Sequence, residues 1–375
     1  MQEVIDLAIP LFKGFMAEEA IQAAGETLRS GYIGQGPRVD LFEEELKLFM
    51  SSPYILTLNS GTSALHLALR LAGVGFGDEV ITTPMTCVAT NVPILANGAK
   101  IVWADIDPAT GNISAEDVER KITSKTRAIL CVDWAGYPCD LEELQATARK
   151  HNLKLIEDAA HGFGSVYKGR FVGGLADFTC FSFQAIKHLT TVDGGALVCA
   201  DEDDCHRGKL LRWFGIDREG PRTDFRCEED VLEYGYKFHM NDVNASIGIQ
   251  QLNHIETILK AHRDNAQFYT EVFSRSGVTL LDYKPDRIGS YLFYTIRVND
   301  PAQFMEKMRE KKITASQVHA RNDKHTAFRE FKTALPGVDA FTNTQVSIPV
   351  GWWLTIEDRE HIANSVIEVF KGVAD

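Results

Sequence analysis

A glycine among hydroxyl-bearing residues marks the first segment that could do chemistry. Residues 59–64 read NSGTSA and stand between a β-rich run and a helical run. Gly61 lets the chain turn tightly, and the hydroxyl of Thr62 together with the free amides of a first helical turn can bind a phosphate group. Ser and Thr also cap helices routinely, so a simple helix cap is the alternative interpretation of this segment.

An acidic segment stands at the end of another β-rich run. Residues 157–161 read EDAAH, which places Asp158 and His161 where a buried strand should end. A carboxylate in that position needs a cationic partner, because burying it unpaired is costly. A protonated pyridine nitrogen is one such partner. A structural salt bridge or a helix cap is the other interpretation.

The third segment carries a lysine. Residues 180–195 read CFSFQAIKHLTTVDGG and include Ser182 and Lys187. A lysine near apolar residues and another cation can have a lowered pKa, which makes its amine nucleophilic toward an aldehyde. Most lysines are solvated surface residues. Lys187, however, comes 29 residues after Asp158, which is enough for one crossover connection within a single sheet.

Together, the three segments supply groups for a phosphate, a ring nitrogen and an aldehyde. Pyridoxal phosphate (PLP) carries all three, so the sequence predicts a PLP site. No P-loop motif and no Gly-x-Gly-x-x-Gly motif opens a helix, and no close cluster of His and Cys suggests a metal.

The elements that must position these residues alternate between strand and helix. We expect strands at 54–58, 79–82, 100–104, 128–132, 154–157, 178–183 and 196–199, with helices at 63–71, 88–96, 115–121 and 141–150 between them. This alternation is typical of an α/β fold with a mainly parallel seven-stranded sheet between helices. Ligands of such sheets bind beyond the carboxyl ends of the strands, where the three segments stand.

The pattern changes after residue 200. A long helical stretch runs over 241–273, followed by a strand pair at 278–281 and 291–298 and by helices at 301–311 and 356–370. We therefore predict a large α/β domain over residues 1–250 and a smaller α+β domain over 251–375. The N-terminal segment could pack with the smaller domain.

Composition excludes several classes of protein. The 375 residues carry 52 acidic and 39 basic side chains, a net charge of −13, which is opposite in sign to that of proteins that coat nucleic acids. No apolar run reaches the ~18 residues of a membrane span. The seven cysteines include no Cys-x-x-Cys pair and are typical of reduced thiols in a cytoplasmic protein. We expect neither nucleic acid nor membrane as a partner.

These motifs resemble those of the DegT/DnrJ/EryC1/StrS family of sugar aminotransferases, PLP-dependent enzymes of fold type I, the aspartate aminotransferase class. The similarity runs from residues 31–36 to the C-terminal helix. Its most specific parts are SGTSAL, EDAAH and FSFQAIKHLTTVDGG, which occur in the family's order.

The resemblance implies a role for each matching residue. Lys187 would bond to the aldehyde carbon of PLP, Asp158 would hold the pyridine nitrogen, and His161 would lie near the ring hydroxyl. The phosphate would be bound by Gly61, Thr62 and Ser182. Cys87 stands where the family often has an aromatic residue that stacks on the cofactor. His239 would reach the phosphate in the neighbouring subunit, which makes the enzyme a homodimer with shared active sites.

Substrate contacts are expected from the second domain. His319, Arg321 and His325 form a cationic segment in a region where the family is rich in histidine. This segment is either a wall for the phosphates or hydroxyls of the substrate or a solvated loop. The resemblance implies transfer of an amino group from L-glutamate to a nucleotide-linked ketosugar, giving an aminosugar such as those of surface polysaccharides.

Three alternative functions remain open at this stage. The acceptor could be a small phosphorylated ketone instead of a nucleotide sugar. The chain could be a PLP-dependent sugar dehydratase, although that branch of the family has His in place of Lys187. It could also be a PLP-binding regulator without turnover, but no DNA-binding helix-turn-helix or basic tail supports that function.

Overall fold

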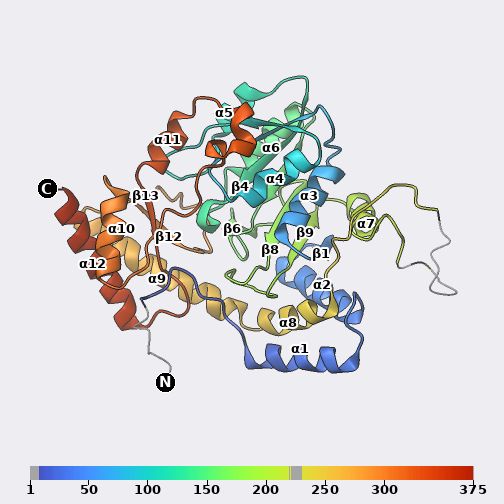
Figure 1. The fold of residues 1–375 in the computed structure, drawn as a ribbon, viewed down its shortest axis with the longest axis horizontal. Coiled ribbons are helices and arrows are strands. Elements are labelled where there is room, and N and C mark those ends of the chain that lie inside the picture. Colours follow the sequence, from blue (N-terminus) through green and yellow to red (C-terminus); the bar gives the residue numbers. More distant parts are fainter. Residues whose placement is uncertain (1–7, 219, 221–229, 375) are drawn as a thin grey trace.

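A seven-stranded sheet in the order β1-β9-β8-β5-β4-β2-β3 forms the centre of the molecule (Figure 1). The computed structural model describes residues 8–218, 220 and 230–374. Strand β9 runs antiparallel to both of its neighbours, and the other adjacent strands are parallel. The strands are β1 Ile55–Leu58, β2 Glu79–Thr82, β3 Lys100–Trp103, β4 Thr126–Val132, β5 Lys154–Asp158, β8 Phe178–Ser182 and β9 Gly195–Cys199. The predicted mainly parallel α/β fold is confirmed.

Helices cover the sheet, and polar residues fix where several of them begin. The side chain of Ser114 caps one helix by accepting the N–H of Asp117, and Asp201 caps another by accepting the N–H of Asp204. The helices that precede, connect or follow the strands are α1 Glu18–Ser30, α2 Pro37–Met50, α3 Gly61–Leu71, α4 Val88–Ala96, α5 Ala115–Lys121, α6 Leu141–Lys150 and α7 Glu202–Leu211.

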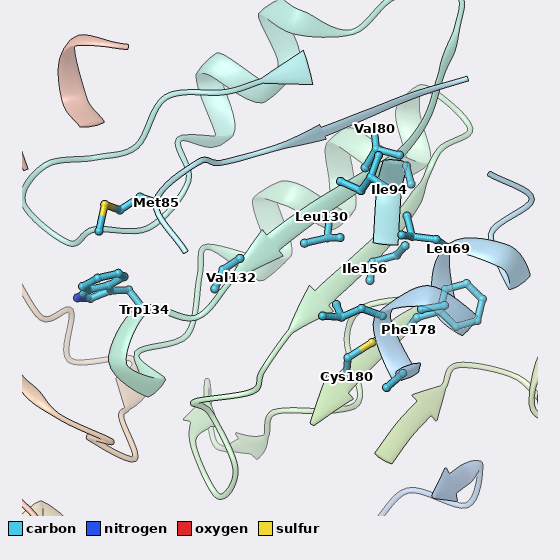
Figure 2. Packing of buried hydrophobic residues seen from close by; sticks show 14 of the residues in the cluster. Leu69, Val80, Met85, Ile94, Leu130, Val132, Trp134, Ile156, Phe178 and Cys180 are labelled. Carbon is cyan, nitrogen blue, oxygen red and sulfur yellow. The ribbon is translucent and has the colours of Figure 1, made fainter. Parts of the chain in front are cut away.

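Apolar side chains pack on both faces of the sheet. In β4, Leu130 and Val132 belong to one buried cluster, and the alternate residues Ile129 and Cys131 belong to another. Figure 2 shows the first of these clusters, in which the side chains of β4 and β5 lie beside those of helices α3 and α4. Strands covered on both faces in this way hold their carboxyl ends in a fixed arrangement.

A second region lies at the other end of the molecule (Figure 1). Its sheet has the order β10-β12-β13, with β10 Thr279–Leu280, β12 Tyr294–Arg297 and β13 Gln345–Ile348. The helices around it are α9 Ile255–Ser276, α10 Pro301–Glu310 and α12 Ile356–Ala374. The N-terminal segment joins this region, because Ile9 pairs with Ile313 in a parallel bridge.

The remaining elements are helix α8 and several short segments. A third sheet has the order β11-β6-β7, and helix α8 lies against α1 and α2. These elements are β6 Val166–Tyr167, β7 Arg170–Phe171, β11 Arg287–Ile288, α8 Asp242–Leu252, α11 Pro336–Thr342 and the 3-10 helices η1 Trp134–Gly136, η2 Asn322–Lys324 and η3 Thr326–Phe331. No helix in the described part of the chain is long and apolar enough to cross a membrane.

The predicted long helix over 241–273 is wrong in one respect: the structure has two helices there, α8 and α9. Between them, His254 donates its N–H to the carbonyl of Gln251 at 3.0 Å, which is a tighter turn than an α-helix has.

The predicted strand over 291–298 begins only at Tyr294 in the structure. Tyr291 has a φ of 54°, in the left-handed region, and the N–H of Leu292 donates to Ala135 of the larger region.

Helix α9 connects the two regions. Ile255 and Leu259 near its start belong to a cluster of the large sheet, whereas Tyr269 and Phe273 belong to the core around β12. Because one helix contributes to both cores, the division at residue 250 stays a prediction.

Candidate active site

The candidate active site is a cavity of about 260 Å³ at the carboxyl ends of β4, β5 and β8. Parallel strands deliver these ends to one edge of the sheet, which brings segments far apart in the sequence together. Eight of the predicted site residues line the cavity: Gly61, Thr62, Cys87, Asp158, His161, Ser182, Lys187 and His319.

Lys187 lies in the connection between β8 and β9, where its N–H donates to the carbonyl of Gln184 at 2.9 Å. Burial lowers the pKa of Lys187 to about 8, because its ammonium group loses hydration in the cavity. The carboxylate of Asp158 acts in the opposite direction and favours the charged form. An amine with this pKa is partly neutral near pH 7, so it can attack an aldehyde carbon.

Asp158 ends strand β5 and is 3% exposed. Its Oδ2 accepts a hydrogen bond from the hydroxyl of Thr90 at 2.6 Å, and its Oδ1 accepts the N–H of Ala160 at 3.1 Å. Burial raises the pKa of Asp158, whereas these two hydrogen bonds and the charge of Lys187 lower it. The side chain is therefore held in one orientation in the wall of the cavity, where a cationic ring nitrogen would stabilise its ionised form.

The start of helix α3 forms another wall. Ser60 caps the helix by accepting the N–H of Ser63 at 3.0 Å. A Cβ atom added to Gly61 would lie 2.9 Å from the Cβ of Ser182, so only glycine permits this approach of α3 to the end of β8. The helix start, Thr62 and Ser182 thus face one space, which suits a phosphate group.

Two histidines stack beside the lysine. The rings of His161 and His319 are nearly parallel, with centroids 5.4 Å apart, and their Nε2 atoms are 3.5 Å apart. Burial lowers the pKa of His161 well below its usual value and that of His319 to about 4. Both rings are therefore neutral at pH 7. The Nδ1 of His161 is buried and has no hydrogen-bond partner among the described residues.

Cys87 lines the cavity immediately before helix α4. The resemblance places an aromatic residue there, but no Phe, Tyr or Trp lines this cavity within the described part of the chain. The aromatic rings in the described part of this wall are the imidazoles of His161 and His319.

Comparison with known proteins identifies the chain. Residues 15–367 match the model of the DegT/DnrJ/EryC1/StrS aminotransferase family. The chain belongs to this family.

Individual members agree with this assignment over nearly their whole length. The sugar aminotransferase CalS13 of Micromonospora echinospora is 38% identical with a TM-score of 0.92, covering 96% of this chain and 99% of its own. The PLP form of the putative sugar aminotransferase Spr1654 of Streptococcus pneumoniae is 28% identical with a TM-score of 0.90, covering 98% and 99%. The spore coat polysaccharide biosynthesis protein SpsC of Bacillus subtilis is 30% identical, covering 97% of each chain.

The cofactor of this family member is PLP, and the residues of the cavity fit it. A nucleophilic amine at Lys187 and a carboxylate at Asp158 line one space, together with the start of helix α3. The unpartnered Nδ1 of His161 leaves one buried polar atom for a further interaction. Lys187 would hold the aldehyde carbon, Asp158 the ring nitrogen, and the α3 start with Ser182 the phosphate.

Three predicted residues lie outside the cavity wall. Arg321 is 6% exposed, and its guanidinium forms ion pairs with Asp323 and Asp339, so it holds this segment together instead of facing the cavity. His325 is exposed. The ring of His239 packs on Trp213 with centroids 4.0 Å apart, so it does not reach the cavity of its own chain.

Sequence reasoning missed the hydroxyl pair formed by Thr86 and Thr90. Their Oγ1 atoms are 2.7 Å apart, and Thr90 donates to Asp158. Both residues line the cavity. The available signal was a pair of hydroxyl-bearing residues at the start of the predicted helix 88–96, since Thr86 stands two residues before helix α4 and Thr90 lies in its first turn.

Proposed function

We propose that this aminotransferase moves the amino group of L-glutamate to the keto carbon of a nucleotide-linked sugar. The products are 2-oxoglutarate and an aminosugar. The observation that carries the assignment is the buried amine of Lys187 beside the carboxylate of Asp158 in one cavity. The sugar as acceptor is supported by the relatives, since CalS13 is a sugar aminotransferase and SpsC serves a coat polysaccharide.

The reaction needs a group that moves one proton. When bound, PLP supplies a conjugated ring that takes up the electron pair left when a substrate carbon loses its proton. Lys187 Nζ accepts the proton from the α-carbon of glutamate and returns a proton to complete the transfer. Its pKa of about 8 suits both steps near neutral pH.

Asp158 would supply a negative charge in the wall of the cavity. The hydrogen bonds from Thr90 and Ala160 hold its two oxygens and stabilise the ionised form. Asp158 would hold the proton on a ring nitrogen and so preserve its positive charge. His161 and His319 are neutral, so they would orient substrate and cofactor by hydrogen bonds without adding charge.

The active site is proposed to be shared in a homodimer. His239 is separated from its own cavity, and its Nδ1 is buried without a partner among the described residues. Apolar side chains near it in the sequence are exposed, with Leu232 at 92% and Tyr234 at 66%. A second subunit covering this surface would bury them and place His239 at the neighbouring cavity.

Subunit complementation tests the shared site. Mixed dimers of Lys187→Ala and His239→Ala chains contain one cavity with both residues intact if His239 acts across the interface. We expect each variant alone to be weakened and the mixture to regain activity. A mixture no more active than its parents, in a sample shown to exchange subunits, contradicts sharing through His239.

The test of the function itself begins with absorbance spectra. The purified protein should show the visible band of PLP bonded to a lysine, and L-glutamate should replace it by a band at shorter wavelength while 2-oxoglutarate is released. The converted protein should then be restored by a nucleotide-linked ketosugar faster than by a small phosphorylated ketone. Restoration by the small ketone alone overturns the proposed acceptor.

The same spectra separate the remaining alternatives. A bound PLP band that glutamate does not change favours another donor, a dehydratase or a regulator. The dehydratase is opposed by Lys187, which stands in the cavity where that branch has histidine. Product analysis after incubation with a nucleotide sugar would show loss of a hydroxyl group if dehydration occurred.

A further inference from the structure

Two further carboxyl groups lie beneath Asp158. Asp133 follows the end of β4, and Glu157 directly precedes Asp158 in β5. The parallel register of β4 and β5 pairs Val132 with Asp158, so all three acids meet at one edge of the sheet. In Figure 2, Val132 and Trp134 mark the two neighbours of Asp133 at the end of β4.

Both carboxyl groups are completely buried. Oδ1 of Asp133 accepts the N–H of Cys139 at 2.9 Å, and Oε2 of Glu157 accepts the hydroxyl of Thr179 at 2.9 Å. The second oxygen of each, Asp133 Oδ2 and Glu157 Oε1, has no donor among the described residues. The two side chains are nevertheless close enough to hydrogen-bond each other.

No cation compensates this pair in the described part of the chain. Neither carboxyl group forms an ion pair with Lys, Arg or His there. The titratable groups that face the pair are Asp158 and the thiols of Cys131, Cys139 and Cys180, each of whose pKa is raised, chiefly by burial for Cys139 and Cys180. The thiols are neutral and therefore supply no positive charge to the pair. Among the groups that act on Asp158, the cation is Lys187.

We propose that Asp133 and Glu157 share a single proton, and that this singly charged pair is a positioning unit that supports Asp158 from behind. A proton between two oxygens without other donors satisfies both of them at once. It also leaves one negative charge instead of two in a buried site, which avoids the repulsion of two adjacent carboxylates. The backbone links the pair to Asp158, because the backbone N–H of Asp133 donates to the backbone carbonyl of Asp158 at 3.2 Å and Glu157 is the preceding residue of the same strand.

The charge of the pair has a consequence for the cofactor site. Asp158 faces the cavity, and the pair lies on its other side, so the negative charge of the pair adds to that of Asp158. Together they would favour a proton on a ring nitrogen held by Asp158. Burial raises the pKa of Asp133 and raises that of Glu157 well above its usual value. The folded protein therefore keeps a proton on the pair above the ordinary carboxyl range, where the unfolded chain has released it.

Amide substitutions test this inference without changing shape. In Asp133→Asn or Glu157→Gln, the new amide donates to the remaining carboxylate, so the hydrogen bond and the single negative charge are both kept. The double variant Asp133→Asn/Glu157→Gln keeps the shape and loses the charge. The three variants therefore separate charge from packing.

The first measurement counts protons released on unfolding of cofactor-free protein near pH 6. The wild type should release about one proton more than either single variant, because only its pair is protonated when folded. Equal release from all of them overturns the shared proton. If a variant does not fold, the infrared spectrum of the folded wild type decides: it should contain the carbonyl band of a protonated carboxylic acid at pH 6, and its absence overturns the inference.

The second measurement concerns the positioning of Asp158. In the holoenzyme, the single variants should convert glutamate at rates within about twofold of the wild type, and the double variant about tenfold more slowly, which corresponds to an ionisation shift of about one pH unit. If the single variants are as slow as the double variant, the negative charge of the pair does not support Asp158 and the inference is overturned. This inference rests on the PLP site of the proposed function, but the proton count needs no substrate, so failure of the proposed acceptor leaves it unaffected.

Discussion

Two buried clusters of charged residues show opposite solutions to the same physical problem. Behind strand β1, Arg212 is 3% and Glu43 is 4% exposed, and they form an ion pair. Glu43 also accepts the N–H and the hydroxyl of Thr57, and Arg212 donates to the carbonyl of Thr57 at 3.0 Å. Each charge there has its partners within the chain.

The cluster at the carboxyl ends of β4 and β5 is different. Asp133, Glu157 and Asp158 are all buried, and two of their oxygens have no donor among the described residues. Burial lowers the pKa of Lys187 beside them. A satisfied ion pair holds its own region together, whereas an incompletely satisfied cluster can bind a cofactor and move a proton. Four substitutions or titrations test this distinction.

The largest effect is expected for Lys187→Ala. Removal of the amine takes away both the covalent link to PLP and the proton carrier, so transamination should fall by at least about 1,000-fold. The matched control is Lys125→Ala, since Lys125 is an exposed lysine far from the cavity in the sequence. The rate of 2-oxoglutarate release measures the activity of both variants. Activity of Lys187→Ala near that of the control contradicts the assigned role.

Substitution in the ion pair of Arg212 and Glu43 should change the stability of the protein instead of its activity. Arg212→Met leaves Glu43 buried without its cation and should lower the free energy of unfolding by about 3–5 kcal/mol. The double variant Glu43→Leu/Arg212→Met removes both charges and should regain much of this loss. Urea unfolding of the cofactor-free proteins measures these changes in the free energy of unfolding. A single variant as stable as the wild type shows that the pair is not the stabilising unit described above.

Much of the structure around the active-site cluster could be predicted from the sequence. The strands of the large sheet were placed to within a residue or two, because each is a short apolar run between helical patterns, as for Glu79–Thr82. Lys187, Asp158 and Gly61 follow such strands, and parallel strands bring their carboxyl ends together. The distinctive motifs and the sheet therefore predicted the same site.

The parts that were not predicted depend on contacts distant in the sequence. Arg321 is cationic in the sequence, but Asp339, which lies 18 residues further on, turns it into a structural group. The break between α8 and α9 depends on a single tight turn at His254, which leaves the apolar periodicity unchanged. The carboxyl pair needed the register of β4 against β5, which no local pattern contains.

A smaller effect is expected where Thr90 supports Asp158. Thr90→Val keeps the shape of the side chain and removes the 2.6 Å hydrogen bond to Asp158. A hydrogen bond to a charged group contributes about 1.5–3 kcal/mol, so the rate of the glutamate half-reaction should fall by about 10- to 150-fold. Thr90→Ser restores the hydroxyl and should recover most of the rate. Equal rates for Val and Ser variants contradict a role for the hydroxyl.

The finest test concerns the ionisation of Lys187 in cofactor-free protein. Capture of added PLP needs the neutral amine, so its rate should rise with pH and level off above the Lys187 pKa of about 8, instead of rising toward the ordinary lysine value. Below pH 8 the rate should fall about tenfold per pH unit. Because burial lowers the pKa of Lys187 in the folded state, the folded protein binds fewer protons than the unfolded chain between pH 8 and the ordinary lysine pKa. The Lys187 contribution to stability therefore increases with pH in that range.

In Arg212→Met, the midpoint of the pH dependence of PLP capture should stay near pH 8 if the two clusters are independent. A midpoint that moves with the distant ion pair, measured by stopped-flow absorbance, would show that the satisfied cluster tunes the reactive one.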